Sequence, residues 1–437
     1  MHEQNLQSIH NMGFACVHDA ALEIDHFGYA GEVMSLRNKH QRFISMLHRE
    51  VDECPEEWLK SFQLFNLANA YFTAGDMPNA ERYFREAASG VNPDEEYTAL
   101  LYVEWATALH RLERSDEGLS VCREAEARGL RHPGLGFAAG YCHLNLGDYA
   151  AARAAFDKAL VSDESSRKYS DISGDAGLSS YKAMFGMALA LKGLGEDGAA
   201  IDMCDKALAL QPQWTEPMYL AAVCHSDMGN LNEAGDLLNR ILELSPGHEK
   251  ALERYTDILF ALENWQQALT HYRQLQQMQP ENGTILCNIA ICQEHLGNWQ
   301  EALNAWSEVA DLTGPNAELL VNVGRVLTAM QAFGPAVDAY TEAIKLRPDY
   351  GNAYFNAGDL LYQLGYYPKA AETYLAGLQV EPERPSGFFV LGNCLFQSGQ
   401  YDAAVLAYGE ELNHNPEHSE ALHNLELAKE ALSSQAA

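Results

Sequence analysis

The sequence predicts an all-α protein built as a stack of helical hairpins, and two periodic series of residues carry that prediction. Alanine recurs at seven positions spaced 34 residues apart, namely Ala200, Ala234, Ala268, Ala302, Ala336, Ala370 and Ala404. Proline keeps the same spacing, with glycine in its place once, at Pro212, Pro246, Pro280, Gly314, Pro348, Pro382 and Pro416. A fixed period of this length indicates a repeat protein in which each repeat is one supersecondary unit.

Two further series share the period and explain how such hairpins would pack. One is made of small residues, Ala188, Ala222, Thr256, Ala290, Gly324, Gly358 and Gly392. The other is made of larger apolar or aromatic residues, Cys204, Leu238, Tyr272, Trp306, Tyr340, Tyr374 and Tyr408. Small residues let the paired helices approach closely, and the large residues fill the space between neighbouring hairpins.

The predicted turns lie between these series. Glycine occurs where the first helix of a hairpin must end, as at Gly195 and Gly365, which suits a left-handed backbone. Asn230, Asn264 and Asn298 follow such turns, each with Glu or Gln three residues later, and this spacing predicts capping boxes at the start of the second helix. The periodic proline then ends that helix.

This combination resembles the tetratricopeptide-repeat (TPR) family. Its pattern has small residues at positions 8 and 27, Ala at 20, an aromatic residue at 24 and Pro at 32. With residue 351 as position 1, one repeat supplies Gly358, Ala370, Tyr374, Gly377 and Pro382. The resemblance covers residues 61–418 with one break, and it implies a right-handed superhelical solenoid of about ten repeats.

The repeats divide the chain into five parts. Residues 1–60 form a non-repeat N-terminal segment, with a short strand expected over 21–29 and a capping helix over 35–51. The remaining parts are the repeats of 61–166 (61–94, 99–132 and 133–166), an insertion at 167–180 whose polar stretch begins at 162, the seven repeats of 181–418 and a capping helix with tail at 419–437.

A second resemblance concerns short segments outside the repeats. The segments are His2-Glu3-Gln4, Ile24-Asp25-His26-Phe27-Gly28-Tyr29, Arg37-Asn38-Lys39-His40-Gln41-Arg42 and Gly177-Leu178-Ser179-Ser180-Tyr181-Lys182-Ala183. They resemble the TPR tail of bacterial family 2 glycosyltransferases. Such enzymes need an α/β domain of roughly 200 residues and an Asp-x-Asp site for a metal. The sequence has no Asp-x-Asp, so the resemblance implies a substrate-recruiting or regulatory module whose catalytic domain is absent from this chain.

Charge and composition narrow the possible partners. The chain has 61 acidic against 29 basic residues, a net charge of −32, which disfavours nucleic acid and anionic membranes. The acidity either attracts a basic protein partner or only keeps a large surface soluble, and both interpretations stay open. No apolar run approaches the ~20 residues of a membrane span, and no signal peptide is evident, so we expect a cytoplasmic protein. The nine cysteines form no C-x-x-C pair, and neither H-E-x-x-H nor G-x-S-x-G occurs. We therefore predict no enzyme activity, no catalytic or metal-binding residues and no cofactor.

The resemblance to TPR proteins implies that positions 2, 5, 6, 9, 12 and 13 of each first helix face an inner groove. The predicted partner-binding residues are Asn66, Asn69, Asn288, Asn322, Arg325, Phe355, Asn356, Asp359, Tyr362, Phe389, Asn393 and Phe396. A ladder of amides would bind the backbone of an extended peptide, and the aromatic residues would take its apolar side chains. These residues predict a protein–protein interaction scaffold. Two alternatives stay open: the position-6 asparagines only bond a neighbouring helix, and the end repeats mediate self-association.

Overall fold

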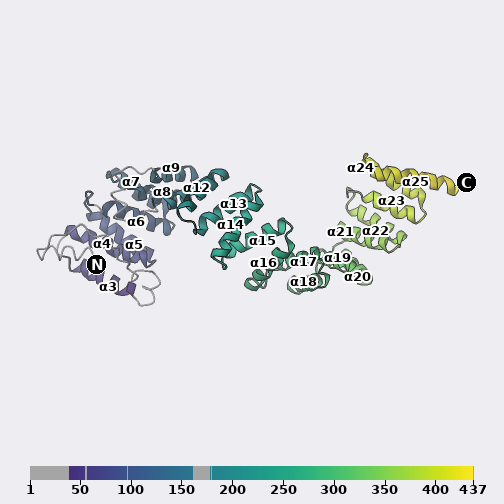
Figure 1. Cartoon of the computed structure of the whole chain (residues 1–437), viewed down its shortest axis with the longest axis horizontal. Coiled ribbons are helices and arrows are strands. Elements are labelled where there is room, and N and C mark those ends of the chain that lie inside the picture. Colours follow the sequence, from purple (N-terminus) through teal and green to yellow (C-terminus); the bar gives the residue numbers. More distant parts are fainter. Residues whose placement is uncertain (1–38, 55–56, 96, 161–177, 179, 437) are drawn as a thin grey trace. The chain divides into compact units, whose positions relative to one another are not determined.

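The computed structural model describes residues 39–54, 57–95, 97–160, 178 and 180–436, and these residues form helices and no strand (Figure 1). The strand expected over 21–29, the polar stretch 162–176 and the segments at 2–4, 24–29 and 37–38 lie outside the described residues. The expected all-α class is therefore confirmed for the described residues. The chain divides into two compact units, residues 1–224 and 225–437, which are described separately below.

The N-terminal unit consists of one leading helix followed by helical hairpins. Its helices are α3 (Lys39–Asp52), α4 (Glu57–Thr73), α5 (Met77–Gly90), α6 (Tyr97–Arg111), α7 (Ser115–Ala127), α8 (Pro133–Asn145), α9 (Tyr149–Leu160), α11 (Tyr181–Gly193) and α12 (Asp197–Leu210). Helix α13 (Thr215–Asp227) contains the boundary between the units. The helix expected over 35–51 corresponds to α3, which packs against α4 through Leu47 and Leu67.

The C-terminal unit continues with hairpins and ends in a single long helix. Its helices are α14 (Leu231–Leu244), α15 (Glu249–Ala261), α16 (Trp265–Met278), α17 (Gly283–His295), α18 (Trp299–Thr313), α19 (Ala317–Ala329), α20 (Phe333–Leu346), α21 (Gly351–Gln363), α22 (Tyr367–Val380), α23 (Gly387–Gln397), α24 (Tyr401–His414) and α25 (Ser419–Ala436). Within each unit, successive helices pack against each other, as in the pairs α16 with α17 and α18 with α19. Such stacking of neighbouring hairpins defines a helical-repeat solenoid.

The turns inside the hairpins are short and left-handed. Gly195 has φ = +76° and Gly365 has φ = +77°, a backbone conformation that glycine adopts without the penalty of a Cβ atom. Both glycines therefore end the first helix of a hairpin, as the sequence predicts. At Gln331 a residue with a side chain occupies the same conformation, with φ = +61°.

The predicted capping boxes are wrong, although the asparagines do stand at the start of the second helices. None of Asn230, Asn264 and Asn298 accepts a capping hydrogen bond on its side chain. A capping box would satisfy the backbone N–H of this residue, but here that N–H already donates to a carbonyl of the preceding helix, as from Asn298 to Gln293 at 2.9 Å. The Asn298 amide also turns back and donates to the Gln293 side chain at 2.9 Å.

The periodic residues form the core, as predicted from their spacing. All seven periodic alanines from Ala200 to Ala404 are 0% exposed, and the seven larger residues that follow them, from Cys204 to Tyr408, are at most 3% exposed. A Cβ atom on Gly324 would lie 2.5 Å from the ring of Tyr340, and one on Gly358 would lie 2.7 Å from the ring of Tyr374. The small residue therefore makes room for the large one within the same hairpin.

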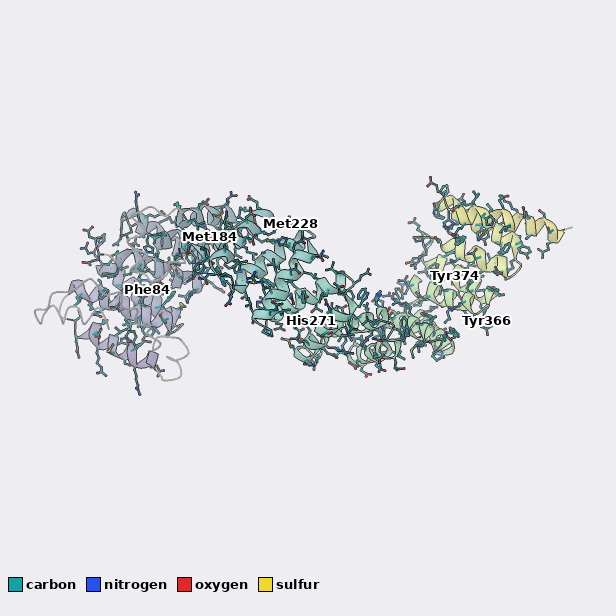
Figure 2. All side chains as sticks on the ribbon, in the orientation of Figure 1. Phe84, Met184, Met228, His271, Tyr366 and Tyr374 are labelled. Atoms are coloured by element: carbon teal, nitrogen blue, oxygen red, sulfur yellow. The ribbon has the colours of Figure 1, made fainter. Side chains whose placement is uncertain are left out.

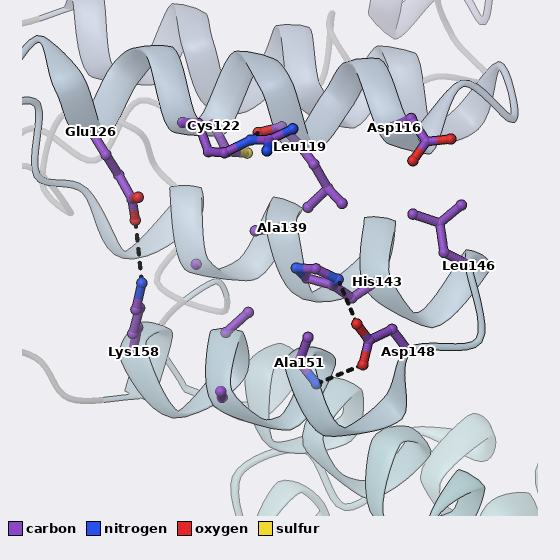
Figure 3. A pocket seen from close by; sticks show the side chains of 14 residues that line it. Asp116, Leu119, Cys122, Glu126, Ala139, His143, Leu146, Asp148, Ala151 and Lys158 are labelled. Atoms are coloured by element: carbon purple, nitrogen blue, oxygen red, sulfur yellow. Dashed lines mark hydrogen bonds and ion pairs between the residues drawn. The ribbon is translucent and has the colours of Figure 1, made fainter.

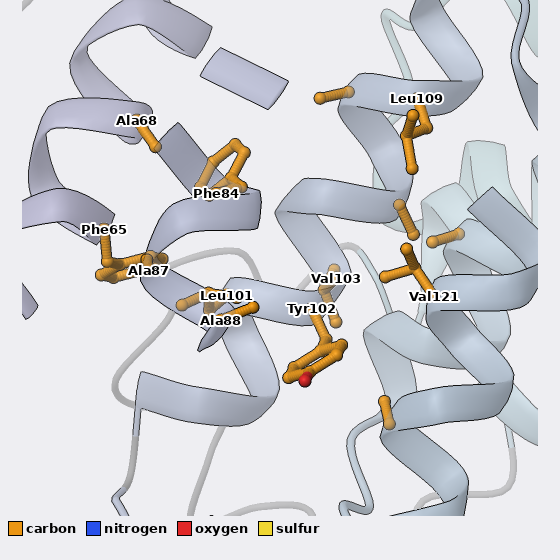
Figure 4. Close-up of a cluster of buried hydrophobic side chains, with 14 of the residues drawn as sticks. Phe65, Ala68, Phe84, Ala87, Ala88, Leu101, Tyr102, Val103, Leu109 and Val121 are labelled. Atoms are coloured by element: carbon orange, nitrogen blue, oxygen red, sulfur yellow. The ribbon is translucent and has the colours of Figure 1, made fainter. Parts of the chain in front are cut away.

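A similar core fills the first hairpins of the N-terminal unit. Figure 4 shows Phe84 between α4 and α5, near Phe65 and Ala68, with Tyr102 and Val121 in the neighbouring hairpin. Phe65 and Phe84 lie with ring centroids 6.2 Å apart, and both side chains are buried. The same packing rule therefore applies at both ends of the chain, even though the first repeats are less regular in sequence.

Candidate binding face of the first helices

The structure distributes the twelve predicted binding residues over five first helices. They lie on α4 (Asn66 and Asn69), α17 (Asn288), α19 (Asn322 and Arg325), α21 (Phe355, Asn356, Asp359 and Tyr362) and α23 (Phe389, Asn393 and Phe396). The two on α4 belong to the N-terminal unit and are partly exposed. The other ten lie in the C-terminal unit, where α19 contacts α21 directly. We call the polar members of this second group the first-helix row: Asn288, Asn322, Arg325, Asn356, Asp359 and Asn393.

Several polar groups of the row are tied to the aromatic residue at position 24 of a hairpin. The hydroxyl of Tyr272 donates to the Asp257 carboxylate at 3.2 Å and accepts from the amide nitrogen of Asn288 at 2.9 Å. Asn288 belongs to the next hairpin, so this chain of hydrogen bonds connects two repeats. For Asn288, the alternative that a position-6 asparagine bonds a neighbouring helix is therefore correct. The amide nitrogen has two N–H donors, and this hydrogen bond uses one of them.

The same arrangement recurs in the last two hairpins. The Tyr374 hydroxyl donates to the Asp359 carboxylate, and the Tyr408 hydroxyl donates to the Asn393 amide oxygen at 2.8 Å. That oxygen also accepts from Asn424 of α25 at 3.0 Å. Burial raises the pKa of both tyrosines, that of Tyr408 to about 12, so the phenols stay protonated and act as donors at neutral pH.

The remaining asparagines of the row use their side chains within one helix. Asn322 accepts from an Arg325 guanidinium nitrogen at 3.4 Å, and Asn356 donates to the Asn352 backbone carbonyl at 2.7 Å. Both residues are partly exposed. Each bond occupies one end of the amide, so the other end can still pair with a peptide backbone.

Arg325 connects the row to a buried carboxylate, Glu294, that is not among the predicted binding residues. Glu294 is 8% exposed, accepts from the Trp306 indole nitrogen at 2.7 Å and pairs with the Arg325 guanidinium. A comparable cluster occurs in the N-terminal unit, where buried Glu81 accepts from Trp105 at 3.4 Å and lies 3.6 Å from Arg114. Glutamate is seldom buried unless paired, and each of these two has both a tryptophan and an arginine partner.

The predicted aromatic residues have different environments. Phe355 is 5% exposed and packs in the core beside Tyr374, with the Arg384 guanidinium 4.8 Å from its ring centroid. Phe389 is partly exposed and lies 4.7 Å from the His418 ring. Little of the Phe355 surface is therefore available to a partner, whereas Phe389 offers more.

Tyr362 and Phe396 belong to a recurring aromatic pair. Their rings meet Tyr367 and Tyr401 edge-on, with both centroid distances at 5.3 Å, and Phe260 meets Trp265 in the same way at 5.1 Å. The second member of each pair is the first residue of the second helix. Aromatic residues recur there with the 34-residue period, at Trp265, Trp299, Phe333, Tyr367 and Tyr401. This series is visible in the sequence as a fifth periodic pattern. Its side chains at Trp265, Tyr367 and Tyr401 pack edge-on against the aromatic side chains of the first helix in the same hairpin.

A separate recess of about 600 Å³ lies in the N-terminal unit among α7, α8 and α9 (Figure 3). An ion pair between Lys158 and Glu126, 3.4 Å apart, lies at one end, and at the other the Asp148 carboxylate lies 3.8 Å from His143 Nδ1. Asp148 also accepts from the Ala151 backbone N–H at 3.1 Å, which caps the start of α9. Glu126, Asp148 and Lys158 are thus already paired with other side chains or with the backbone.

The thiols of Cys122 and Cys142 are poor nucleophiles at neutral pH. Burial raises the pKa of Cys122 and of Cys142 to about 12, which leaves almost no thiolate at neutral pH. Within the described residues, no group of three or more His, Cys, Asp and Glu side chains is placed to hold a metal ion. Nor does any described helix have the length and apolar character needed to cross a bilayer.

Side chains cover the hairpins of both units along their whole described length, with Tyr374 enclosed and Tyr366 at the surface (Figure 2). Tyr366 is 57% exposed, whereas Tyr374 is 2% exposed. The two tyrosines differ because one lies in the turn and the other at the periodic core position. The repeat position, rather than the residue type, therefore decides whether an aromatic side chain is available at the surface.

Comparisons with known proteins agree with this architecture. Sequence models described as "Tetratricopeptide repeat" and "TPR repeat" match residues 103–169, 257–317, 324–365 and 367–419, and the model "Anaphase-promoting complex, cyclosome, subunit 3" matches 196–275. No curated protein matches the sequence.

Several solved structures are similar to the chain. The APC/C hetero-tetramer Cut9-Hcn1 is 12% identical over 91% of this chain and 95% of that one, with a TM-score of 0.40. Yeast Tom70 is 15% identical over 93% and 95%, with a TM-score of 0.37. The TPR domain of P58(IPK) is 18% identical over 86% and 99%, with a TM-score of 0.32. From the matching repeat models and the periodic packing of its hairpins, the chain belongs to the tetratricopeptide-repeat family.

Proposed function

We propose that the chain is a protein–protein interaction scaffold that binds a partner segment along the first helices of its C-terminal unit. The observation that carries this proposal is the first-helix row, in which successive helices present amide and charged groups at the same repeat positions. Asn322 and Asn356 are partly exposed, and each has one end of its amide engaged within its own helix. An extended peptide has alternating backbone donors and acceptors, which amides of this kind can match.

The charge of the chain favours a basic partner. The net charge of −32 attracts a Lys- or Arg-bearing segment at long range and repels nucleic acid. Phe389, Tyr362 and Phe396 lie beside the row and would take apolar side chains of the same segment. The partner that fits best is therefore an extended, basic peptide with occasional apolar residues, met in the cytoplasm.

We further propose that the chain itself is not an enzyme. The raised pKa values of the thiols and the internal pairing of Asp148, Glu126 and Lys158 favour a structural role for these groups. An assay for sugar-nucleotide binding and hydrolysis tests this proposal together with the glycosyltransferase alternative. Turnover by the isolated chain would overturn the non-catalytic proposal.

The alternative is a recruiting or regulatory module of a bacterial family 2 glycosyltransferase. It is favoured by the sequence segments at 24–29, 37–42 and 177–183. This alternative also predicts protein binding, but with a glycosyltransferase catalytic domain as the partner. Mixing the chain with such a domain and measuring a change in its substrate preference would separate the alternative from a general scaffold.

The test of the main proposal is a binding screen on an array of peptides with varied sequence. The Asn322→Ala/Asn356→Ala variant is compared with the wild type and with Asn239→Ala/Asn304→Ala, which removes two exposed amides from second helices. We expect the first variant to lose peptides that the wild type and the control retain, with equal melting temperatures in all three proteins. Equal binding by all three would contradict the proposal, and a large drop in melting temperature would assign the two asparagines to the fold.

Self-association through the end repeats is a further proposal that the same samples test. Light scattering over a concentration series measures the mass of the wild-type chain. A mass that stays at 48.4 kDa at all concentrations would contradict self-association.

A further inference from the structure

A second surface lies on the last two hairpins and is lined by other residues than those of the first-helix row. A groove of about 460 Å³ lies between α22 and α24. Both helices pack against α23, and Figure 1 shows the order of the three helices. Leu391 of α23 is buried in its floor, and Phe388 lies beside it. Leu375 and Leu406 line the two sides, and their side chains are 50% and 71% exposed.

The repeat register shows that these two leucines are exceptional. Leu375 occupies position 25 of its repeat, where the five preceding repeats have the exposed polar residues Asp205, Asn239, Arg273, Ser307 and Thr341. Leu406 occupies position 22, where the six preceding repeats have the exposed polar residues Asp202, Asp236, Thr270, Asn304, Asp338 and Glu372. The fold therefore places no requirement for an apolar residue at either position.

Two leucines at otherwise polar positions face each other across one groove. An exposed leucine that becomes fully buried against a partner contributes favourable free energy in proportion to the apolar area removed from water. A single exposed leucine is ordinary, but two that flank an apolar groove form the kind of contiguous patch that marks an interaction site. The groove offers such burial without any change in the packing of α22, α23 and α24.

The charge around the groove indicates what kind of partner fits. Glu372 and Glu410 line it, and none of the described residues that line it is Lys or Arg. Helices α22 and α24 together carry four carboxylates and one lysine, Lys369. A second copy of the chain fits poorly, because the exposed Leu422 and Leu427 on α25 are accompanied by further glutamates. Like charges would then face each other across the contact.

We propose that this groove binds an amphipathic helix of another protein, with an apolar face flanked by Lys or Arg. A helix fits because the groove is bounded by two helices and floored by a third, so that side chains at i, i+3, i+4 and i+7 insert between them. The basic residues would pair with Glu372 and Glu410 at the rim. Its two exposed leucines lie on second helices, and none of the residues that line the groove belongs to the first-helix row.

The test uses a fluorescein-labelled synthetic helix of leucine and lysine, with leucines at i, i+3, i+4 and i+7, and the full chain. Binding is measured by fluorescence anisotropy at about 0.15 M salt, where long-range attraction is screened. In the Leu375→Thr/Leu406→Asn variant, each leucine is replaced by the residue that another repeat has at that position. The matched control is Asp338→Ala/Thr341→Ala, which changes the same two repeat positions on α20.

We expect the leucine variant to bind the peptide at least about tenfold more weakly, since two leucine contacts are lost. The control and Asn322→Ala/Asn356→Ala should bind like the wild type, and all proteins should melt at the same temperature. Equal affinity of the leucine variant and the wild type would overturn the proposal. So would equal binding of a peptide with Glu in place of Lys, or a dimeric wild type that becomes monomeric in the leucine variant.

Discussion

The indole nitrogen of Trp306 donates a hydrogen bond of 2.7 Å to Glu294, a carboxylate that is almost enclosed between two repeats. Arg325 of the next hairpin supplies the second partner of that carboxylate. Glu294 therefore joins α17 to its own second helix and to the following repeat. Removing one partner of a buried carboxylate leaves part of its desolvation cost uncompensated.

We expect Arg325→Ala to lower the free energy of unfolding by about 1–2 kcal/mol, less than for a fully buried pair because the arginine is half exposed. Adding Glu294→Gln in the same chain should recover part of this loss, since the amide oxygen still accepts from Trp306 and no charge remains buried. Urea unfolding of the two single variants and the double variant measures the coupling. Strictly additive effects would show that the two side chains do not interact.

The close approach of Gly392 and the Tyr408 ring predicts that a side chain at position 392 destabilises the fold, and Gly409 of the same hairpin serves as the control position. A Cβ atom on Gly392 would lie 2.6 Å from the Tyr408 ring, whereas one on Gly409, in the second helix of the same hairpin, would meet nothing within 4 Å. Alanine normally stabilises a helix interior by about 1 kcal/mol relative to glycine. We expect Gly409→Ala to raise the melting temperature and Gly392→Ala to lower it. If both substitutions stabilise the protein, the ring of Tyr408 can move aside freely.

The sequence predicted the hairpins because their spacing repeats seven times without interruption, so packing constraints such as Ala370 beside Tyr374 appear in register. The same period also indicates which polar residues, such as Asn322 and Asn356, share a position on successive first helices. The sequence could not indicate which hydrogen bonds those positions make, because the Tyr272 hydroxyl reaches Asn288 across a repeat boundary that no local pattern encodes. The capping boxes failed for a related reason. The backbone of the tight turn already satisfies the group that the box would serve.

The raised pKa of Tyr408 predicts how stability changes in alkaline solution. Burial raises this pKa to about 12 in the folded protein, against about 10 for an unfolded tyrosine. The protonated phenol therefore stabilises the fold fully below pH 10, and this contribution is lost as the pH rises from 10 through about 12. Tyr408→Phe should cost about 1 kcal/mol at pH 8 because the hydrogen bond to Asn393 is lost.

The difference in stability between Tyr408→Phe and the wild type should then shrink between pH 10 and about 12, because only the wild type has this phenol to ionise. Guanidinium unfolding at several pH values measures it. A Tyr366→Phe variant serves as control, since Tyr366 is exposed and loss of its hydroxyl should leave the stability unchanged. A difference that stays constant up to about pH 12 would show that Tyr408 is not responsible for the alkaline loss of stability.

The buried cysteines predict a protein whose thiols react mainly after unfolding. Burial raises the pKa to about 12 for Cys122, Cys142, Cys204 and Cys394, and to about 11 for Cys292. At pH 8 the thiolate fraction of such a group is on the order of one in a thousand or less, and the thiolate is the form that reacts with Ellman's reagent. Cys54 and Cys287 are only partly buried, so we expect them to react first.

The experiment uses a Cys16→Ser background, because Cys16 lies outside the described residues. In the native protein, Cys287→Ser should remove part of the fast labelling, whereas Cys122→Ser should leave it unchanged. In about 6 M guanidinium every remaining thiol should react, because unfolding removes the burial that raises each pKa. Fast native labelling that disappears in Cys122→Ser would mean that the hairpins of α7 and α8 open readily, since these helices enclose the Cys122 sulfur.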